Sequence, residues 1–330
     1  MRRGRIESIH FPDSGQQPEA GSQQMQSEAV NVQAAVEVIA DNGDLCGEGP
    51  HWDEREQALY WTDIDGQKFY RYLWRERRHE LLHSGFTVNG FCMQEGGGFL
   101  TTSSAGAWLW RPGAEPVLLA SEADGQEMRL NDCLADPEGR VYSGSYHLNP
   151  DGTSPPSYLF RIDTDGTAHV VDEGICFSNG LAFSPDCKTL YFTDLVARCI
   201  YAYDWRRSDG ALSNRRVFVR IDRAEGMPDG LTVDAEGFLW IAHWFGGCVT
   251  RYDPDGKRER KVEFPAKQTS SLAFGGPELD EIYVTTAAMN NCLMLAPIGY
   301  DPAQVLVGGP LYRFRAGIRG KLKFRSRVRE

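Results

Sequence analysis

"GEGPHWDEREQALYWTD", residues 47–63, is a phrase that the rest of this 330-residue chain repeats in altered form. In each copy a polar residue leads into a short apolar run, a polar turn follows, and a second run is rich in aromatic and β-branched residues. Successive copies begin about 41 to 50 residues apart, which is the spacing of propeller blades. The further copies are "VNGFCMQEGGGFLTTS" at 88, "LNDCLADPEGRVYSGS" at 130, "SNGLAFSPDCKTLYFTD" at 178, "PDGLTVDAEGFLWIAH" at 228 and a degenerate "TSSLAFGGPELDEIYVTT" at 269.

Each copy, with the segment after it, predicts a small antiparallel sheet. Aromatic runs such as "FYRYLW" at 69–74 and "IYAYDW" at 200–205 supply further strands, and helical periodicity is almost absent. Six meanders of about four strands, arranged radially, make a six-bladed β-propeller. We therefore expect an all-β fold with one domain over residues 31–315. "AVEVIA", residues 35–40, should add a strand to the last blade and close the ring.

The two ends of the chain differ from this domain in composition. Residues 1–30 are rich in Gln, Ser and Gly and are expected to form a disordered leader. Residues 316–330 form a basic tail. Residues 313–330 hold eight basic and one acidic residue, a net +7 against −11 for the whole chain, which leaves −18 on residues 1–312. The tail could attract a polyanion, but we expect a solvated terminus.

Composition also limits the partners. The acidic body disfavours nucleic acid and suits a bound cation. The chain has no hydrophobic signal region and no apolar run of ~20 residues, so we expect a cytoplasmic protein with no membrane partner. Its eight cysteines are widely spaced, with no C-x-x-C pair, which favours free thiols over a structural zinc site.

The residues that start the copies carry the functional prediction. In a propeller the first strand of each blade lines the central channel, so these residues should converge at one channel mouth. "NG" and "DG" are common tight turns, but turns alone would not fall at the same point of every blade. Hard divalent cations prefer converging oxygen donors of this kind. The predicted set is Glu48, Asn89, Asn131, Asn179, Asp229 and, less clearly, Ser270.

These motifs resemble those of the senescence-marker-protein-30/gluconolactonase group, which includes regucalcin and bacterial sugar lactonases. The resemblance covers roughly residues 35–315 and rests on "GEGPHW", "RLNDCLADPEGR", "FSNGLAFSPD", "MPDGLTVDAEGFLW" and "SLAFGG" in that order. It implies a hydrolase that opens aldonolactones, such as gluconolactone or a pentonolactone, with one divalent cation, which could be Ca²⁺, Zn²⁺, Mn²⁺ or Mg²⁺.

The resemblance also implies roles for individual residues. Glu48, Asn179 and Asp229 would be the metal ligands, and Arg129 and Asn131 would contact the hydroxyl groups of the sugar. Asp229 is also the candidate catalytic residue, because a carboxylate beside a cation stays ionised and can accept a proton from water.

Two departures from the family pattern concern specificity. Cys133 replaces a glycine after "ND", and "GSYHLN" carries no acid near Asn149 where regucalcin-type members have one. We expect the loop at residues 146–157 to overhang the cation site. Alternative functions are a metal-dependent esterase or organophosphate hydrolase on the same propeller, or a non-catalytic cation-binding propeller. A monomer or weak oligomer is expected.

Overall fold

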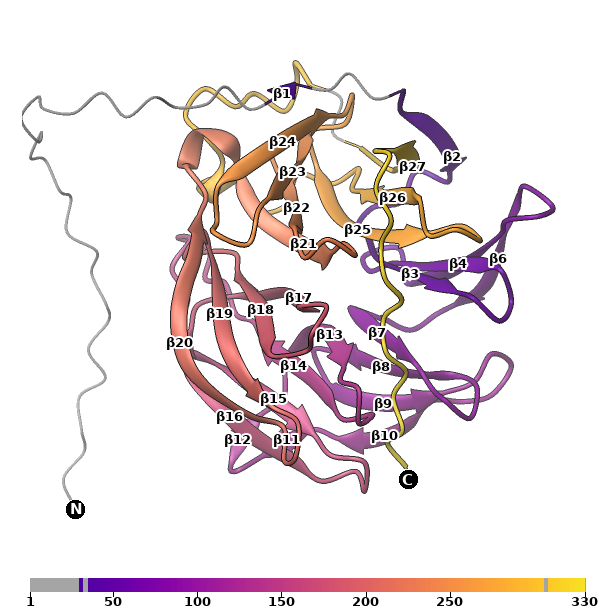
Figure 1. Cartoon of the computed structure of the whole chain (residues 1–330), viewed down its shortest axis with the longest axis vertical. Helices are drawn as coiled ribbons and strands as arrows, with labels where there is room; N and C mark the ends of the chain where they lie inside the picture. Colours follow the sequence, from indigo (N-terminus) through magenta and orange to yellow (C-terminus); the bar gives the residue numbers. More distant parts are fainter. Residues whose placement is uncertain (1–29, 32–34, 306–307, 330) are drawn as a thin grey trace, which may run out of the picture.

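The computed structural model of the chain describes residues 30–31, 35–305 and 308–329. Six antiparallel sheets of four main strands stand around a central axis (Figure 1), so the predicted six-bladed β-propeller is confirmed. Every neighbouring pair of innermost strands is in contact, including the first and the last, so the ring is closed. No helix among these residues is long and apolar enough to cross a membrane.

The first three blades are consecutive meanders, each running outward from the axis. Blade 1 contains β3 (Gly47–Asp53), β4 (Ala58–Asp63), β5 (Lys68–Leu73) and β6 (Arg78–Ser84). Blade 2 contains β7 (Gly90–Met93), β8 (Phe99–Ser103), β9 (Gly106–Trp110) and β10 (Val117–Ala120). A short hairpin, β11 (Glu122–Ala123) and β12 (Gln126–Glu127), leads to blade 3, which contains β13 (Leu130–Ala135), β14 (Val141–Ser145), β15 (Ser157–Ile162) and β16 (Ala168–Ile175).

The last three blades complete the circle. Blade 4 contains β17 (Ser178–Phe183), β18 (Thr189–Asp194), β19 (Cys199–Arg206) and β20 (Ala211–Arg220). Blade 5 contains β21 (Met227–Val233), β22 (Leu239–Trp244), β23 (Cys248–Tyr252) and β24 (Arg258–Glu263), preceded by the 3-10 turn η1 (Arg223–Glu225). Blade 6 contains β25 (Thr269–Gly275), β26 (Glu281–Thr286) and β27 (Pro310–Arg315), with the 3-10 turn η2 (Leu293–Leu295) between the last two strands.

The N-terminal side of the domain closes the ring. β2 (Glu37–Asp41) pairs antiparallel with β27 as the outermost strand of blade 6, as the sequence predicted. β1 (Val30–Asn31) pairs with β24 of blade 5. The predicted leader otherwise lies outside the described residues. All eight cysteines are free thiols, which confirms that prediction.

The turn between the first two strands of a blade is often held by an Asp. Asp136 Oδ1 accepts the backbone N–H groups of Glu138 and Arg140 at 2.8 and 3.0 Å. Asp234 Oδ1 does the same for Glu236 and Phe238. Asp favours such turns because its short side chain bonds to the backbone two residues on. The "DPEG" and "DAEG" sequences thus end the inner strands of blades 3 and 5.

Glycine is required where inner strands of adjacent blades approach each other. A Cβ on Gly180 would lie 2.4 Å from Leu231 N, and one on Gly90 would lie 2.8 Å from Asp132 Cα. A Cβ on Gly230 would lie 2.1 Å from Ser271 Oγ. The "NG" and "DG" pairs therefore belong to inner strands and permit close approach, and they are not hairpin turns.

Large side chains fill the wedges between blades. Between blades 5 and 6, for example, Trp240, Phe274 and Phe314 belong to one buried cluster. Each such side chain contributes about 1.5–3 kcal/mol when it is fully removed from water. The seams between blades hold the ring rigid, and the rigid ring in turn positions the residues at its axis.

The basic tail differs from the expectation of a solvated terminus. The yellow C-terminal trace in Figure 1 leaves β27 and crosses the ring past β3 and β7 toward β10. Its backbone bonds to turns of the blades, with Ser326 N donating to Met93 O and Arg327 N donating to Gly139 O. Ser326 and Val328 are buried. Residues 317–329 are called the C-terminal strap below. The expectation was wrong because it considered charge alone.

The closure between blades 6 and 1 predicts a pH effect on stability. The peptide groups of Asp44 bond to Gly309 and Ala288. Burial raises the pKa of the Asp44 carboxyl to about 7, an effect that the Trp61 indole N–H at 2.8 Å only partly offsets. Nearby Asp63 raises this pKa further. The folded chain thus holds a proton that the unfolded chain releases above its usual pKa of 3.8, so stability falls as pH rises from that value to about 7.

Asp44→Asn should remove this dependence. The melting temperature of the variant, measured relative to the natural chain, should rise by at least about 3 °C between pH 5 and pH 8. The exposed Asp41→Asn is the matched control and should show no such trend. Parallel curves for Asp44→Asn and the natural chain would contradict the assignment.

Candidate active site at the channel mouth

Irregular strand pairing turns the predicted residues toward the channel. The register between the first two strands shifts at Glu48/His51, Leu130/Cys133, Ser178/Leu181 and Pro228/Leu231. Such bulges bend a strand locally and re-aim its side chains. Glu48, Asn131, Asn179 and Asp229 lie within or beside these shifts. The same local device therefore recurs in blades 1, 3, 4 and 5.

A cavity of about 190 Å³ forms where these residues meet. Five of the six predicted residues line it, namely Glu48, Asn89, Asn131, Asn179 and Asp229. Ser270 does not, because its hydroxyl donates to Gly47 O at 2.6 Å and links blade 6 to blade 1. The remaining wall is largely apolar and aromatic, with Ile64, Tyr146, Phe177, Leu195, Met227 and Trp244.

The carboxylates of the site are crowded and short of partners. Burial raises the pKa of Glu48 well above its usual value, and the charge of Asp132 raises it further. Burial likewise raises the pKa of Asp229, with Glu48 as the next cause. Burial raises the pKa of Asp132 to about 6. The sequence had not marked Asp132, although it follows Asn131 directly. A positive charge at this place would relieve the repulsion.

The donor atoms fit a hard divalent cation. Asn179 Oδ1 and Asp229 Oδ1 are buried and have no hydrogen-bond partner in the structure. Glu48 Oε2 accepts the N–H of the adjacent Gly49, at 2.9 Å. Buried polar atoms are rarely left without partners, and carboxylate and amide oxygens are the ligands that Ca²⁺, Mg²⁺ and Mn²⁺ prefer. Among the described residues no three His, Cys, Asp or Glu side chains cluster as metal ligands, so an amide must complete any such set.

The two predicted sugar contacts lie differently. Asn131 lines the cavity, and its Nδ2 donates to Ser178 O at 2.8 Å. This bond links blade 3 to blade 4 and fixes the orientation of the Asn131 amide group. Arg129 is half-buried just before β13 and is not among the lining residues. Its Nε is buried without a partner, so the guanidinium retains an unused donor.

Cys133, which stands where the family pattern has glycine, points toward blade 2. Its Sγ lies 3.5 Å from the Sγ of Cys92 on β7. The residue therefore packs in the seam between blades 2 and 3. Cys133 therefore acts on the site indirectly, by setting the positions of Asn131 and Asp132, which precede it on β13.

The cavity wall is supplied by two loops. From the predicted loop at 146–157, Tyr146 lines the cavity, and its hydroxyl accepts from Asn89 Nδ2 at 3.2 Å. The rest of that loop is not among the lining residues, and a Cβ on its Gly152 would touch Met294. Asn291 and Cys292, from the connection between β26 and β27, complete the wall. The sequence had given no role to that connection, because it has no repeat or motif.

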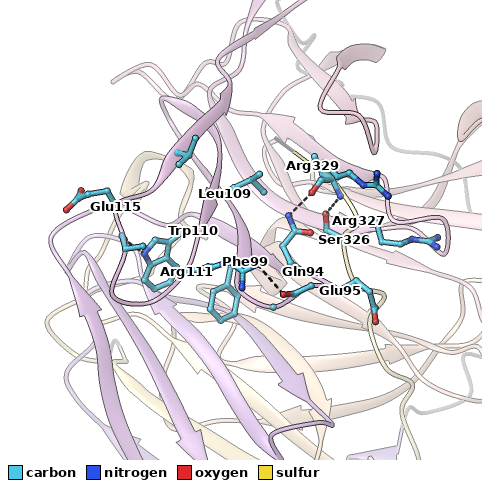
Figure 2. A pocket seen from close by; sticks show the side chains of 15 residues that line it. Gln94, Glu95, Phe99, Leu109, Trp110, Arg111, Glu115, Ser326, Arg327 and Arg329 are labelled. Carbon is cyan, nitrogen blue, oxygen red and sulfur yellow. Dashed lines mark hydrogen bonds between the residues drawn. The ribbon is translucent and has the colours of Figure 1, made fainter.

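A larger hollow of about 520 Å³ lies elsewhere, between blade 2 and the C-terminal strap. Figure 2 shows Trp110, Phe99 and Leu109 on one side and Ser326, Arg327 and Arg329 on the other. It contains no converging oxygen donors like those of the smaller cavity. Chemistry, not size, therefore identifies the channel mouth as the candidate active site.

Comparisons with known proteins identify relatives of the chain. Residues 46–288 match the family described as the SMP-30/gluconolactonase/LRE-like region. The pentonolactonase XacC of Haloferax volcanii is 35% identical over 296 residues, which cover 88% of this chain and 98% of the relative. Regucalcin of Xenopus laevis is 33% identical over 258 residues, covering 76% of this chain and 86% of the relative.

A solved structure supports the same relationship. The crystal structure of a calcium-binding protein, regucalcin, from Agrobacterium tumefaciens superposes with a TM-score of 0.78 at 25% identity. The match covers 92% of this chain and all of that one.

Because the carboxylates are crowded, substituting Glu48 should have opposite effects on thermal stability in the absence and in the presence of a cation. Glu48→Gln removes a buried charge, so in chelator the variant should melt at a higher temperature than the natural chain. Added cation at a hundred times its Kd should raise the melting temperature of the natural chain by roughly 4 °C, because it binds only the folded state. The rise should be less than half as large for Glu48→Gln.

Asp65→Asn is the matched control. Asp65 is exposed at the rim of the same cavity and accepts from Asn291 Nδ2 at 3.2 Å. This variant should keep the full response to cation. Equal responses of Glu48→Gln and the natural chain in differential scanning fluorimetry would remove Glu48 from the cation site.

Proposed function

The chain belongs to the SMP-30/gluconolactonase/LRE-like family, and from this we propose that it hydrolyses sugar lactones at the channel mouth with the help of one divalent cation. The observation that carries the proposal is the pair of buried, unpartnered oxygens on Asn179 and Asp229 beside Glu48. A lactonase relative with 35% identity over nearly its whole length supports the reaction class.

Glu48, Asn179 and Asp229 are the proposed cation ligands. They come from β3, β17 and β21, so the set forms only when blades 1, 4 and 5 are closed around the axis. When bound, a divalent cation supplies Lewis acidity, which polarises the lactone carbonyl and stabilises negative charge on its oxygen. Ca²⁺ is favoured by the calcium-binding relative, while the all-oxygen donor set also suits Mg²⁺ and Mn²⁺.

Asp229 is the proposed proton acceptor for the attacking water. Asp229 lines the cavity, and its Oδ1 is buried without a hydrogen-bond partner, so the carboxylate keeps an oxygen that can accept a proton. Burial raises its pKa in the cation-free chain, and a nearby positive charge favours the ionised form. The proton taken from water can then be passed to the ring oxygen that leaves the carbonyl carbon.

Asn131 and Arg129 are the proposed orienting residues. The Asn131 amide is fixed by Ser178 O and borders the cavity, so its oxygen can accept from a sugar hydroxyl. Arg129 would reach the substrate only by turning its half-buried guanidinium toward the cavity. The cavity volume of about 190 Å³ is below the ~300 Å³ at which pockets for drug-sized ligands begin, and this favours a single sugar ring.

The direct test is hydrolysis of a panel of lactones and esters. Pentonolactones and hexonolactones should be opened in the presence of Ca²⁺, Mn²⁺, Mg²⁺ or Zn²⁺, and exhaustive chelation should abolish the activity. Aryl esters and organophosphates serve as the comparison class, and the corresponding kcat/KM values should be at least about 100-fold lower. Full lactone hydrolysis in protein shown by elemental analysis to hold no cation would refute the metal-dependent reaction.

The role of Asp229 can be separated from simple ligation. Asp229→Asn keeps an oxygen donor of the same shape, so excess cation should restore occupancy, as measured by calorimetry. The amide cannot accept a proton from water at neutral pH, so kcat should remain about 10²–10⁴-fold below that of the natural chain. Asn179→Asp is the control, since it alters a ligand and spares the acceptor. Full recovery of kcat in Asp229→Asn at saturating cation would leave Asp229 as a ligand alone.

A further inference from the structure

The C-terminal strap makes contact with all six blades on the face opposite the cavity. Its backbone bonds to blade 6 through Gly320 N and Leu279 O at 2.7 Å, and to blade 5 through Ala235 N and Arg319 O at 2.9 Å. It then bonds to blades 2 and 3. Its last backbone bond is donated by Arg329 N to Thr164 O of blade 3. The partners in blades 2, 3, 5 and 6 lie where inner strands end, except Thr164, which lies in the turn between β15 and β16. The cavity lies where the inner strands begin.

Basic side chains of the strap reach the blades between these backbone contacts. Lys321 Nζ donates to Phe183 O and Ser184 O of blade 4, at 2.8 and 3.2 Å. Arg325 donates to Asp53 and Glu54 of blade 1, at 2.7 and 3.1 Å. The gap left beneath residues 321–324 is only about 20 Å³. The far end of the channel is therefore shut by the chain's own terminus.

Lys323 differs from the other basic residues of the strap because it reaches into the channel. Its Nζ donates to Pro50 O at 3.1 Å. Pro50 is buried on β3, two residues after Glu48 on the strand that lines the channel. Asp53, which pairs with Arg325, is the last residue of the same strand, at the end away from Glu48.

We propose that the strap is a fixed plug of the channel and that Lys323 is the built-in counter-charge of the Glu48 and Asp132 carboxylates. This inference deepens the proposed function and rests on it for the cation. Lys323 acts as a positioning residue: it limits carboxylate repulsion when no cation is present and opposes excess positive charge when one is bound.

The surroundings of Lys323 support this role. Burial lowers the pKa of its ammonium group, and the Asp132 and Glu48 carboxylates act in the opposite direction. Conversely, burial raises the pKa of Asp132, and the positive charge of Lys323 acts against this rise. The strap also lies outside residues 46–288, so the family match does not imply it.

A double-mutant cycle in cation-free protein tests the counter-charge directly. Lys323→Met keeps the length of the side chain and removes its charge, so its melting temperature in chelator should fall by several degrees. In the Glu48→Gln background part of that loss should disappear, because one of the two carboxylates that Lys323 balances is gone. Lys321→Met is the matched control: it breaks two hydrogen bonds of the same strap, and its loss should be equal in both backgrounds.

Cation selectivity gives a second readout that a purely structural role would not change. Ca²⁺ and Tb³⁺ both bind hard oxygen ligands and differ by one charge. Removing Lys323 should therefore strengthen Tb³⁺ binding more than Ca²⁺ binding. The ratio of the two Kd values in Lys323→Met should change by roughly three- to ten-fold in favour of Tb³⁺. Lys321→Met should leave the ratio unchanged. Lys323→Arg keeps the positive charge and should show the same ratio as the natural chain.

The two experiments separate the two proposals. If the natural chain binds none of Ca²⁺, Mn²⁺, Mg²⁺, Zn²⁺ and Tb³⁺, the proposed function fails, while the double-mutant cycle in cation-free protein still decides the role of Lys323. An equal loss of stability for Lys323→Met with and without Glu48→Gln overturns the counter-charge. A Kd ratio in Lys323→Met equal to that of Lys321→Met overturns it as well.

Discussion

The structure depends on how closely six inner strands can approach one axis. At Gly90, Gly180 and Gly230 a single added Cβ would collide with the neighbouring blade. Each of these glycines directly follows a polar residue that lines the cavity. The spacing that closes the ring is therefore the spacing that gathers the oxygen atoms. Fold and site share one constraint, and a change at these glycines would disturb both at once.

This gathering of oxygens concentrates negative charge where little water is present. Glu48 and Asp229 are buried, and Asp132 lies beside Glu48, so the cation-free site stores repulsion. Rigid packing of the blades holds the groups in place despite this cost. Functional sites commonly oppose stability in this way. A cation that joins strands from three blades would relieve the repulsion and tie the blades together.

Much of the fold followed from the sequence because its signals repeat. Six copies of one motif fixed the blade number, and the polar residue before each strand gave five lining residues. Features that occur once were missed. The connection from 287 to 309 has no periodic pattern, so the contribution of Asn291 and Cys292 was invisible. Asp132 was passed over because its charge acts on Glu48 from blade 3 to blade 1, which only the closed ring brings together.

The basic terminus carried a signal that counting charges overlooked. From Arg319 to Arg329 every second residue is basic, and the residues between them are uncharged. This is the alternation of an extended segment with two faces. Arg319, Arg325 and Arg327 pair with acids of the turns, and Lys321 and Lys323 find backbone carbonyls. The excess positive charge of the tail thus neutralises part of the acidic ring within the same molecule. With the far end of the channel shut, a substrate can reach the carboxylates only from the cavity side, past the walls set by Tyr146 and Asn291.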